Sequence, residues 1–563
     1  MKTKLTIGLV VLLTATGWAY GNQRKLGRDL DGIDPNSYVD VIIQYKHVPT
    51  EVHHQKVRDQ GGVLRRRYGR VRSGFYTVPA RSLAQLAKDP EVTFITPDRK
   101  VHGKLDVTAA TVNAPVAWQL GLDGTGIGVA IIDSGITEVN DLAIKGVSRV
   151  VYSQDFVGTG TDDFYGHGTH VAGIVAGNGA DSICTTCTRT LQGIAPNANL
   201  INLRVLDENG SASDSTVIAA IDQAIALASK YNIRVINLSV GRPVMESYTQ
   251  DPMCQAVEAA WQAGIVVVVA AGNDGRDNSF GENGYGTITA PGNDPYVITV
   301  GAMKNEGTPD RKDDMIASYS SKGPSMLDLV VKPDIVAPGN LTVSLLANST
   351  DTLPTTEPTT LTPNTYYNSA GDGSPSSVYY TLSGTSMATP VVSGAAALLL
   401  QQNPALTPDQ VKATLMLTAS KTFPTSSKAT DPMTGQTFTS YYDIFTVGAG
   451  YLDIGAALAS TEVPTGTALS PTVAYNSATN NVSLVTDPSA VWGTSVVWGT
   501  SAVGSTSVLS GTSVVWGTSV VGGTSVVWGT SVVWGTSVVW GTSVVWGTST
   551  MSADSLVAAL GEK

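Results

Sequence analysis

Apolar runs alternate with helix-type patterns through the middle of this 563-residue chain, and this alternation limits what it can fold into. An apolar run at 200–205 is followed by a helix-type pattern at 217–230 and by a second apolar run at 235–240. A strand, a helix and a strand at this spacing favour a parallel sheet. With 42% apolar residues the chain can fill a large core. We therefore predict an α/β fold with helices on both faces of the sheet.

A serine lies where an apolar helix pattern at 391–400 begins. Ser386 belongs to the stretch Gly-Thr-Ser-Met-Ala-Thr-Pro at 384–390, and its small neighbours leave room for a substrate. Pro390 fits a first helical turn, where its missing N–H matters little. At a helix N-terminus the dipole and the free N–H groups favour a developing anion. These features are typical of a nucleophile.

A serine nucleophile needs a base, and the base needs an orienting group. The chain has six histidines, and only His167 and His170 lie beyond residue 102. Both belong to a Gly-His-Gly-Thr-His motif that opens a small-residue helix pattern. Asp133 ends the apolar run 128–132, and α/β folds place site residues at the carboxyl ends of such strands. The candidates follow one another as Asp133, His167 and Ser386.

These motifs resemble the active-site motifs of the subtilisin-like serine proteases, family S8. The three matching segments are Asp-Ser-Gly at 133–135, the histidine motif at 166–173 and residues 384–390. A fourth segment, Ala-Ala-Gly-Asn-Asp-Gly at 270–275, resembles the family's oxyanion-hole segment. The resemblance covers about 105–460, and it implies a subtilisin-like fold and a serine endopeptidase.

The resemblance also implies a role for each residue. Ser386 attacks the scissile carbonyl, and His167 takes its proton and later gives one to the leaving amine. Asp133 fixes the imidazole tautomer, while the Asn273 side chain and the Ser386 N–H stabilise the oxyanion. The chemistry needs no cofactor. The partners are protein or peptide substrates.

Each residue taken alone has another interpretation. An aspartate at a strand end is often a cap, and Asn273 in Gly-Asn-Asp-Gly would be a turn residue. His167 and His170 could be a metal pair, but a metalloprotease motif has a glutamate between its histidines, and this one does not. We therefore predict no catalytic metal and expect His170 to be a packed helix residue.

The resemblance predicts where a substrate lies. An extended peptide would bind along one edge segment, and a second short segment would form another wall of the S1 pocket. The first comprises Leu238, Ser239, Val240 and Gly241; the second comprises Ala271 and Gly272. Arg242 departs from the glycine common in the family, so the outer pocket is altered. Residues 289–292 offer no acid, and we expect a broad, apolar-leaning specificity.

Calcium is common in the family. Asp141 falls where one family site has a ligand, but the loop 177–193 lacks the usual ligand segment and carries two cysteines instead. We expect that site to be absent. Structural calcium at a weaker site near Gly292 and Asp294 remains an alternative.

The N-terminal part has features of a secreted precursor. Residues 1–21 combine a charged start, a short apolar stretch and small residues, which is typical of a signal peptide and predicts secretion. Residues 34–102 contain three expected strands, at 38–45, 74–78 and 92–95, and a short helix at 80–88. This small α+β segment resembles the family's inhibitor-like propeptide, and the catalytic domain would cover 103–460.

Charge is unevenly distributed. Residues 22–102 hold 15 Lys or Arg and 9 Asp or Glu, a net +6, whereas residues 103–563 hold 18 and 37, a net −19. A basic prodomain complements an acidic protease, as expected if the propeptide is also its inhibitor. The run Arg-Arg-Arg-Tyr-Gly-Arg at 65–70 could also be a solvated run or a processing site. The acidic remainder predicts no nucleic-acid binding.

Three cysteines are too few for a disulfide scaffold. Cys184 and Cys187 could form a local disulfide or remain free, and Cys254 is expected to be buried beside a helix at 255–263. Residues 341–380, rich in Thr, Ser, Pro and Asn, are predicted to be a surface insertion.

The C-terminal region is a repeat. After an expected linker at 461–490, the sequence Thr-Ser-Val-Val-Trp-Gly recurs with period six over 491–549, followed by a tail at 550–563. An even period keeps Thr, Val and Trp on one face of a strand. Hairpins, a small solenoid, a strand stack between chains and a disordered tail all fit the pattern. The tryptophan faces could also contact glycans or a cell surface.

Two functions of different class follow. The first is a secreted serine endopeptidase made as a self-processed zymogen. The second is a cell-surface adhesin that acts through the Trp repeat, with the protease domain as scaffold. The four motifs favour the first.

Overall fold

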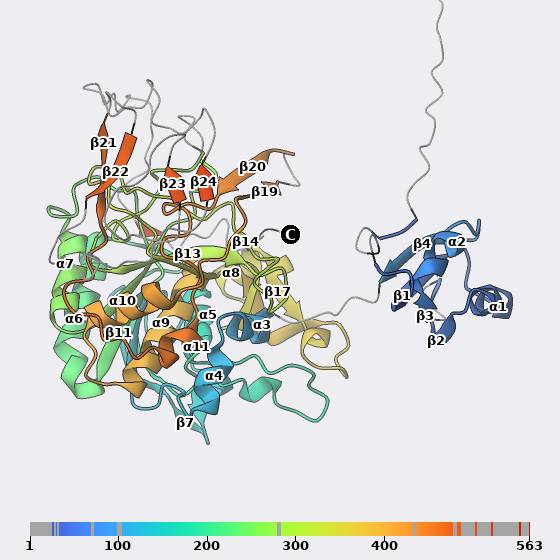
Figure 1. Ribbon diagram of the computed structural model, residues 1–563. Helices are drawn as coiled ribbons and strands as arrows, with labels where there is room; N and C mark the ends of the chain where they lie inside the picture. The colour runs from blue at the N-terminus through green and yellow to red at the C-terminus, as the bar shows by residue number, and fades with distance from the viewer. Residues whose placement is uncertain are drawn as a thin grey trace, which may run out of the picture. The chain divides into compact units, whose positions relative to one another are not determined.

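The structure is a computed structural model, and it divides into two compact units, Met1–Val101 and His102–Lys563 (Figure 1). It describes residues 25–27, 30, 33–68, 72–97, 104–277, 283–431, 435–476, 481–485, 501–503, 519–521, 551–552 and 562. The predicted signal peptide lies outside these residues. Within the described ranges, no helix combines the length and the apolarity that a membrane span requires.

Unit 1 is an antiparallel sheet with two short helices. The strand order is β2-β3-β1-β4, and the core includes Val41, Ile43, Tyr76 and Ile95. The elements are β1 (Tyr38–Tyr45), α1 (Glu51–Asp59), β2 (Val63–Tyr68), β3 (Ser73–Pro79), α2 (Leu83–Leu86) and β4 (Val92–Pro97). The three predicted strands are confirmed, whereas the helix predicted at 80–88 is a 3₁₀ turn at Ala80–Ser82 followed by the four-residue α2.

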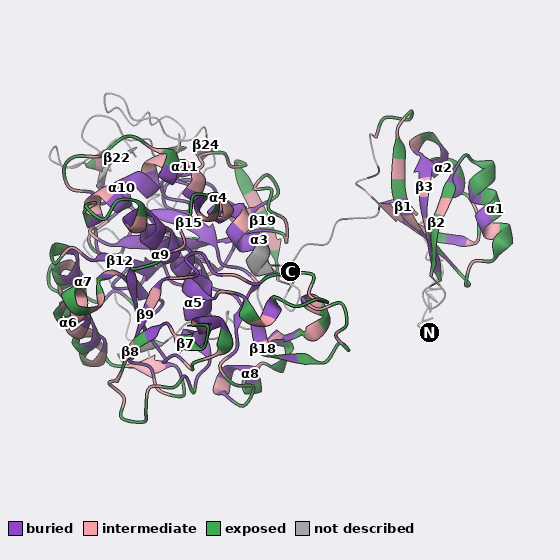
Figure 2. Ribbon diagram, turned by 90° about the horizontal axis from the view of Figure 1, so that it is seen from below, coloured by how far each residue is buried: buried purple, intermediate pink, exposed green. Residues whose placement is uncertain are grey.

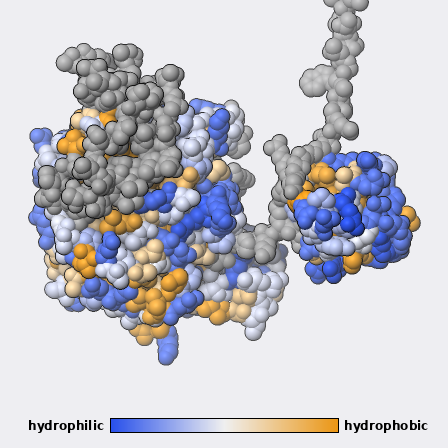
Figure 3. All heavy atoms as spheres, in the orientation of Figure 1, coloured by the Kyte–Doolittle hydropathy of each residue, from blue (hydrophilic) through white to orange (hydrophobic). Residues whose placement is uncertain are grey.

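Sequence patterns missed α1 and β2, because both carry mostly exposed polar side chains. In α1 only His54 and Val57 are buried. The arginine run lies largely in β2, where Arg65, Arg66 and Arg67 are exposed. The face of unit 1 seen in Figure 3 is accordingly mostly hydrophilic.

Unit 2 is built on a parallel sheet, as predicted. The strand order is β14-β13-β12-β11-β5-β9-β8, with β15 also paired to β13, and only the β13–β14 pair is antiparallel. Strands β5, β12 and β13 are buried along their whole length, as parallel strands covered on both faces must be. The bounds are β5 (Gly128–Asp133), β8 (Val150–Asp155), β9 (Asn199–Arg204), β11 (Ile233–Leu238), β12 (Val266–Ala270), β13 (Ile298–Lys304), β14 (Met315–Ile316) and β15 (Ile335–Pro338).

Helices cover both faces of this sheet. Helices α6 (Asp214–Tyr231) and α7 (Pro252–Gln262) pack together on one face, and α5 (His167–Ala176) and α9 (Thr385–Gln402) pack together on the other (Figure 1). The second pair lies at the centre of the buried core (Figure 2). Around them lie α3 (Lys104–Thr111), α4 (Ala114–Gln119), α10 (Pro408–Thr418) and α11 (Ile454–Ala459). The buried, unpaired Cys254 lies in α7, as expected.

Two segments are more structured than their composition indicated. The predicted surface insertion contains β16 (Thr342–Leu345), α8 (Thr352–Thr356), β17 (Leu361–Pro363) and β18 (Pro375–Leu382), and it buries Val343, Leu345, Tyr379 and Tyr380. The expected linker contains a hairpin of β21 (Thr472–Asn476) and β22 (Asn481–Val485). Val473 and Val482 pack with Val331 and Phe445, so this part belongs to the fold.

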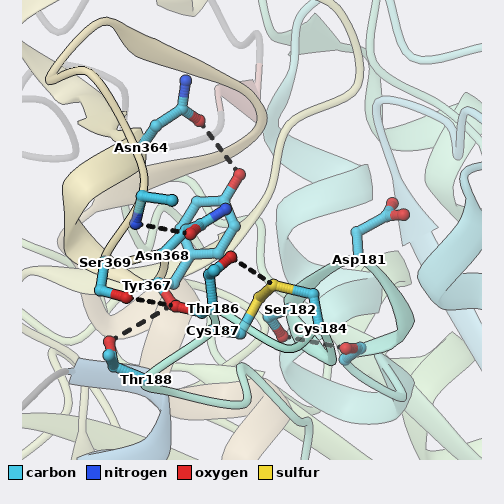
Figure 4. The surroundings of a disulfide bond; sticks show 12 residues. Asp181, Ser182, Cys184, Thr186, Cys187, Thr188, Asn364, Tyr367, Asn368 and Ser369 are labelled. Carbon is cyan, nitrogen blue, oxygen red and sulfur yellow. Dashed lines mark hydrogen bonds between the residues drawn. A yellow bond between two sulfur atoms is a disulfide. The ribbon is translucent and has the colours of Figure 1, made fainter.

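Cys184 and Cys187 form a disulfide, which settles the alternative left open by the sequence. Their loop lies against residues 364–369 of the insertion (Figure 4). The Thr186 carbonyl accepts hydrogen bonds from Ser369 N and Oγ, at 2.9 and 2.8 Å. The disulfide loop therefore holds one side of the insertion.

Most of the Trp repeat lies outside the described residues. Two described strands, β23 (Ser501–Val503) and β24 (Ser519–Val521), pair in parallel, with Ser501 opposite Ser519. That offset is 18 residues, three periods of the hexapeptide, so equivalent repeat positions face each other.

Candidate active site

Asp133 and His167 meet at the carboxyl end of the sheet. Asp133 is the last residue of β5 and His167 the first of α5. His167 Nδ1 lies 2.8 Å from Asp133 Oδ1, and both side chains are fully buried. The Ser134 N–H donates to the same Oδ1 at 2.8 Å. A proton on Nδ1, held by the carboxylate, leaves Nε2 as the ring's acceptor.

A second aspartate holds these segments together, and sequence reasoning missed it. Asp163 Oδ1 accepts from Ser134 Oγ and Gly166 N, both at 2.7 Å, and its Oδ2 accepts from Thr169 N at 2.8 Å. Ser134 Oγ in turn accepts from Gly168 N at 2.8 Å. Asp163 therefore ties the strand end that carries Asp133 to the helix start that carries His167. The available signal was its place four residues before the histidine.

Ser386 lies in the first turn of α9, as predicted. Its Oγ donates to the Ser239 carbonyl at 3.1 Å, and Ser239 Oγ donates to the Ser386 carbonyl at 2.9 Å. Ser239 directly follows β11, which neighbours β5 in the sheet. The nucleophile candidate is thus fixed to the segment expected to bind substrate.

The Asn273 amide is oriented by the residue before Ser386. Its Oδ1 accepts from Thr385 N at 2.9 Å and from Thr385 Oγ1 at 3.1 Å. The Nδ2 is buried, and no described residue pairs with it. Gly384 lies beside this amide with φ 147°, and an added Cβ would come within 3.3 Å of Nδ2. The arrangement leaves a donor aimed beside the serine, which is what an oxyanion requires.

The expected substrate-binding residues divide into backbone and wall positions. The side chains of Leu238 and Ala271 are fully buried, and their contribution to a pocket wall stays a prediction. Gly241 and Gly272 both face Thr289; a Cβ on either would lie 2.5 to 2.8 Å from that side chain. Both glycines therefore pack closely against Thr289 and have no room for a side chain, and Val240 is buried beside them.

The positive charge of Arg242, which stands where the family commonly has glycine, is balanced by two carboxylates. It is nearly buried and forms ion pairs with Asp214 at 2.9 Å and Asp251 at 2.8 Å. Its guanidinium links the start of α6 to the segment 238–241, so it offers no free positive charge to a substrate.

His170 is a packed helix residue, as predicted. Its Nε2 lies 3.1 Å from the Thr342 carbonyl, and its ring meets Tyr380 edge-on with centroids 5.0 Å apart. Burial lowers the pKa of His170 to about 3, so its imidazole is neutral.

Two of the calcium candidates, Asp141 and Gly292, are engaged in other contacts. Asp141 accepts from Tyr379 Oη and from Asp181 N, both at 2.7 Å, and burial raises its pKa to about 6. The Gly292 carbonyl accepts from Thr299 Oγ1 at 2.6 Å. Across the part of the chain that is described, no three His, Cys, Asp or Glu residues gather where they could hold a metal ion. Asp294 Oδ1 accepts from Tyr296 N at 2.8 Å, and its Oδ2 is buried with no hydrogen-bond partner among the described residues, so structural calcium near Gly292 and Asp294 stays a prediction.

Comparison with known proteins gives consistent matches. Residues 124–438 match the sequence model of the subtilase family, Peptidase_S8. Serine protease AprX of Bacillus subtilis (strain 168) is 39% identical over 329 residues, covering 56% of this chain and 66% of AprX. Subtilisin E of the same organism is 30% identical over 387 residues, covering 67% of this chain and 84% of subtilisin E.

A solved structure of a cold adapted subtilisin-like serine proteinase is 30% identical. It covers 53% of this chain and 84% of its own, with a TM-score of 0.38.

Proposed function

The chain belongs to the subtilase family and is a serine-type endopeptidase, and on this premise we propose that it cuts peptide bonds with Asp133, His167 and Ser386. The observation that carries the assignment is the buried 2.8 Å contact between His167 Nδ1 and Asp133 Oδ1. A buried imidazole whose Nδ1 is held by a carboxylate presents Nε2 as a base.

The reaction follows from these groups. The Ser386 hydroxyl, which here donates to the Ser239 carbonyl, turns to His167 Nε2 and gives up its proton as Oγ bonds to the scissile carbon. The carbonyl oxygen becomes an anion and accepts from Asn273 Nδ2 and Ser386 N. His167 then gives its proton to the leaving amine, and water repeats the sequence to release the acyl group.

The substrate is a protein or peptide chain bound in extended form. We infer that the backbone of residues 239–241 pairs with it, close to Gly272 and Thr289. Thr289 carries no charge, and Arg242 is already paired with two carboxylates. Both features favour broad, apolar-leaning specificity.

The protein is, in this proposal, a secreted zymogen. Unit 1 is compact by itself and basic, and unit 2 is acidic, as expected for a propeptide that inhibits the enzyme from which it is cut. The adhesin alternative concerns residues that lie mostly outside those described, and it stays a prediction.

The test is Ser386→Ala, with Ser229→Ala as the matched control, because Ser229 is an exposed serine of α6. Casein hydrolysis and labelling by a fluorophosphonate probe should vanish in the first variant and persist in the second. Labelling at another serine would overturn the assignment. So would activity that a chelator abolishes and only zinc restores.

A further inference from the structure

Residues of unit 2 that are far from Glu562 in the sequence bind both its backbone and its side chain, as a protein binds a peptide ligand. Its backbone N–H donates to Asn340 Oδ1, and its carbonyl accepts from Asn340 Nδ2, both at 2.8 Å. Its carboxylate accepts from Arg276 Nη2 at 2.7 Å, from Ser318 N at 2.9 Å and from Ser318 Oγ. Asn340, Ser318 and Glu562 are all buried. The Asn340 amide thus binds the backbone of Glu562, and the Arg276 guanidinium binds its carboxylate.

Asn340, Ser318 and Arg276 form the pocket that binds Glu562, and this pocket is close in the chain to Ser386 and Asn273. Asn340 follows Gly339, whose carbonyl accepts from Gly384 N at 2.9 Å, two residues before Ser386. Arg276 comes three residues after Asn273, and the intervening Gly275 N–H donates to the Tyr319 carbonyl at 2.8 Å. The pocket is therefore connected to Ser386 through the contact between Gly339 and Gly384, and to Asn273 through the chain.

A second contact joins the C-terminal part to the other side of the site. Strand β25 (Met551–Ser552) pairs antiparallel with β10 (Ser211–Ala212). The residue before β10, Gly210, lies against the ring of Tyr165, to which an added Cβ would come within 2.5 Å. Tyr165 in turn lies beside His167, with ring centroids 6.4 Å apart.

One ion pair links the chain just after β10 to the segment expected to bind substrate. Two residues after β10, Asp214 pairs with Arg242, which directly follows Gly241. A short strand edge at this place can pair with any extended peptide through its backbone. In this structure its partner is the chain's own C-terminal part.

We propose that Met551, Ser552 and Glu562, here called the C-terminal clip, are an intramolecular ligand of the peptide-binding surface, and that a substrate must displace them. The inference rests on the proposed function of the same site. One end of the clip pairs with β10, which is connected to His167 through Gly210 and Tyr165. The other end is held by Asn340 and Arg276, which lie close in the chain to Gly339, the partner of Gly384, and to Asn273. Ser386 and Asn273 are 2% and 6% exposed in this state.

The clip has a kinetic consequence. If a substrate binds only molecules whose clip is open, the apparent affinity falls by the open fraction. Removing the clip should lower KM and leave kcat unchanged, because the clip takes no part in bond cleavage. The pocket itself should accept an acidic peptide supplied from outside.

The experiment uses the full chain with Glu562→Lys, which places a cation against Arg276. The matched control is Glu462→Lys, at an exposed glutamate whose carboxylate makes no described contact. On a short fluorogenic peptide, Glu562→Lys should lower KM roughly tenfold, the effect of losing one charge-assisted contact set, with kcat unchanged. Glu462→Lys should behave as wild type.

A synthetic peptide of residues 551–563 gives a second measurement, in which the competition experiment uses only the wild-type chain. It should compete with substrate in the wild type, and the same peptide with Glu562→Lys should compete several-fold more weakly. Fluorescence anisotropy should show tighter binding of the labelled peptide to the Glu562→Lys chain, whose pocket is vacant. An unchanged KM together with equal, weak binding to both chains would overturn the clip.

The two proposals fail in different ways. Absence of probe labelling and of turnover in every form counts against the triad. Normal labelling with identical KM values and no competition by the peptide counts against the clip alone.

Discussion

At the scale of single residues, the site depends on the Asn273 side chain, whose amide oxygen and amide nitrogen have different roles. The Asn273 Oδ1 is occupied by Thr385, which leaves Nδ2 as a donor. Asn273→Ala removes both ends, whereas Asn273→Asp keeps the acceptor and removes the donor. Both should lower kcat by about 10²–10³ with little change in KM, a magnitude known from subtilisin itself.

Steady-state kinetics on a short peptide measures the effect, and thermal unfolding controls for folding. A change confined to KM would mean that Asn273 binds substrate without stabilising the oxyanion.

Asp351 gives the protein a pH-dependent weakness near the site. Burial raises its pKa to about 7, helped by the nearby Asp163. Its Oδ2 is buried, and no described residue pairs with it. The folded state therefore binds this proton more tightly than the unfolded state, whose pKa is near 3.8. The resulting stabilisation is complete below about pH 4 and is lost as the pH rises through about 7.

Asp351→Asn should then raise the free energy of unfolding at pH 8, on the order of 1–2 kcal/mol, and give no gain at pH 4. Denaturant unfolding in a Ser386→Ala background, which avoids self-digestion, measures it. Asp222→Asn, at an exposed position of α6, is the control. Equal gains at both pH values would show that titration is not the cause.

At the scale of elements, a buried ionic cluster fastens α10 to the sheet. Lys412 of α10 lies 3.3 Å from Asp334, and Lys332 lies 2.7 Å from the same carboxylate; all three are fully buried. Lys412 Nζ also donates to the carbonyls of Pro295 and Val297 and to Ser470 Oγ, at 2.8 to 2.9 Å. The cluster joins a helix, the loop before β13, the strand β15 region and the segment before β21.

Lys412→Met should cost about 3–5 kcal/mol, because it leaves buried acceptors without their donor. Lys312→Met, where the side chain is 88% exposed, should stay within about 0.5 kcal/mol of the parent. Chemical unfolding in the Ser386→Ala background measures the free energy of unfolding of both variants. A similar loss in both variants would show that the cluster contributes nothing specific.

Elements with a strong apolar period could be predicted from the sequence, and elements held by long-range contacts could not. Strand β5 at 128–133 is one residue longer than expected, and helix α6 at 214–231 begins three residues earlier and ends one residue later than expected. Strand β10 has two half-buried residues and no periodic signal. The insertion 341–380 buries Tyr379 and Tyr380, but its composition resembles a surface loop.

The same division holds within the site. Short motifs mark Asp133, His167, Asn273 and Ser386, because small neighbours and strand ends can be recognised locally. The contribution of Asp163 depends on Ser134, 29 residues away, and that of Asn340 on Glu562, 222 residues away. No local pattern encodes such pairs.

At the scale of the whole molecule, the proposed zymogen predicts an uncut precursor. Ser386→Ala should accumulate with residues from about 22 onward still attached, whereas wild type should be cut near 102–105. The released fragment of about 80 residues carries a net +6, and the remainder carries −19. Added back, the fragment should inhibit, and the inhibition should weaken between 50 and 500 mM salt, roughly a threefold shorter Debye length.

N-terminal sequencing of the mature protein and inhibition assays at the two salt concentrations check this. A fully active wild type that still begins near residue 22 would falsify the zymogen.

Two segments of unit 2 that are about 340 residues apart in the sequence lie side by side. The Ile454 N–H donates to the Val112 carbonyl at 2.9 Å, Asn113 Nδ2 donates to Asp453 at 2.9 Å, and α11 packs on α4. A short peptide could join these segments, and the chain could be reopened at the exposed turn of Lys145 and Gly146. The reordered polypeptide would then read His167, Ser386, Asp133. The sequence order Asp133, His167, Ser386 would then be a property of the chain's connectivity and not of the chemistry that these side chains perform.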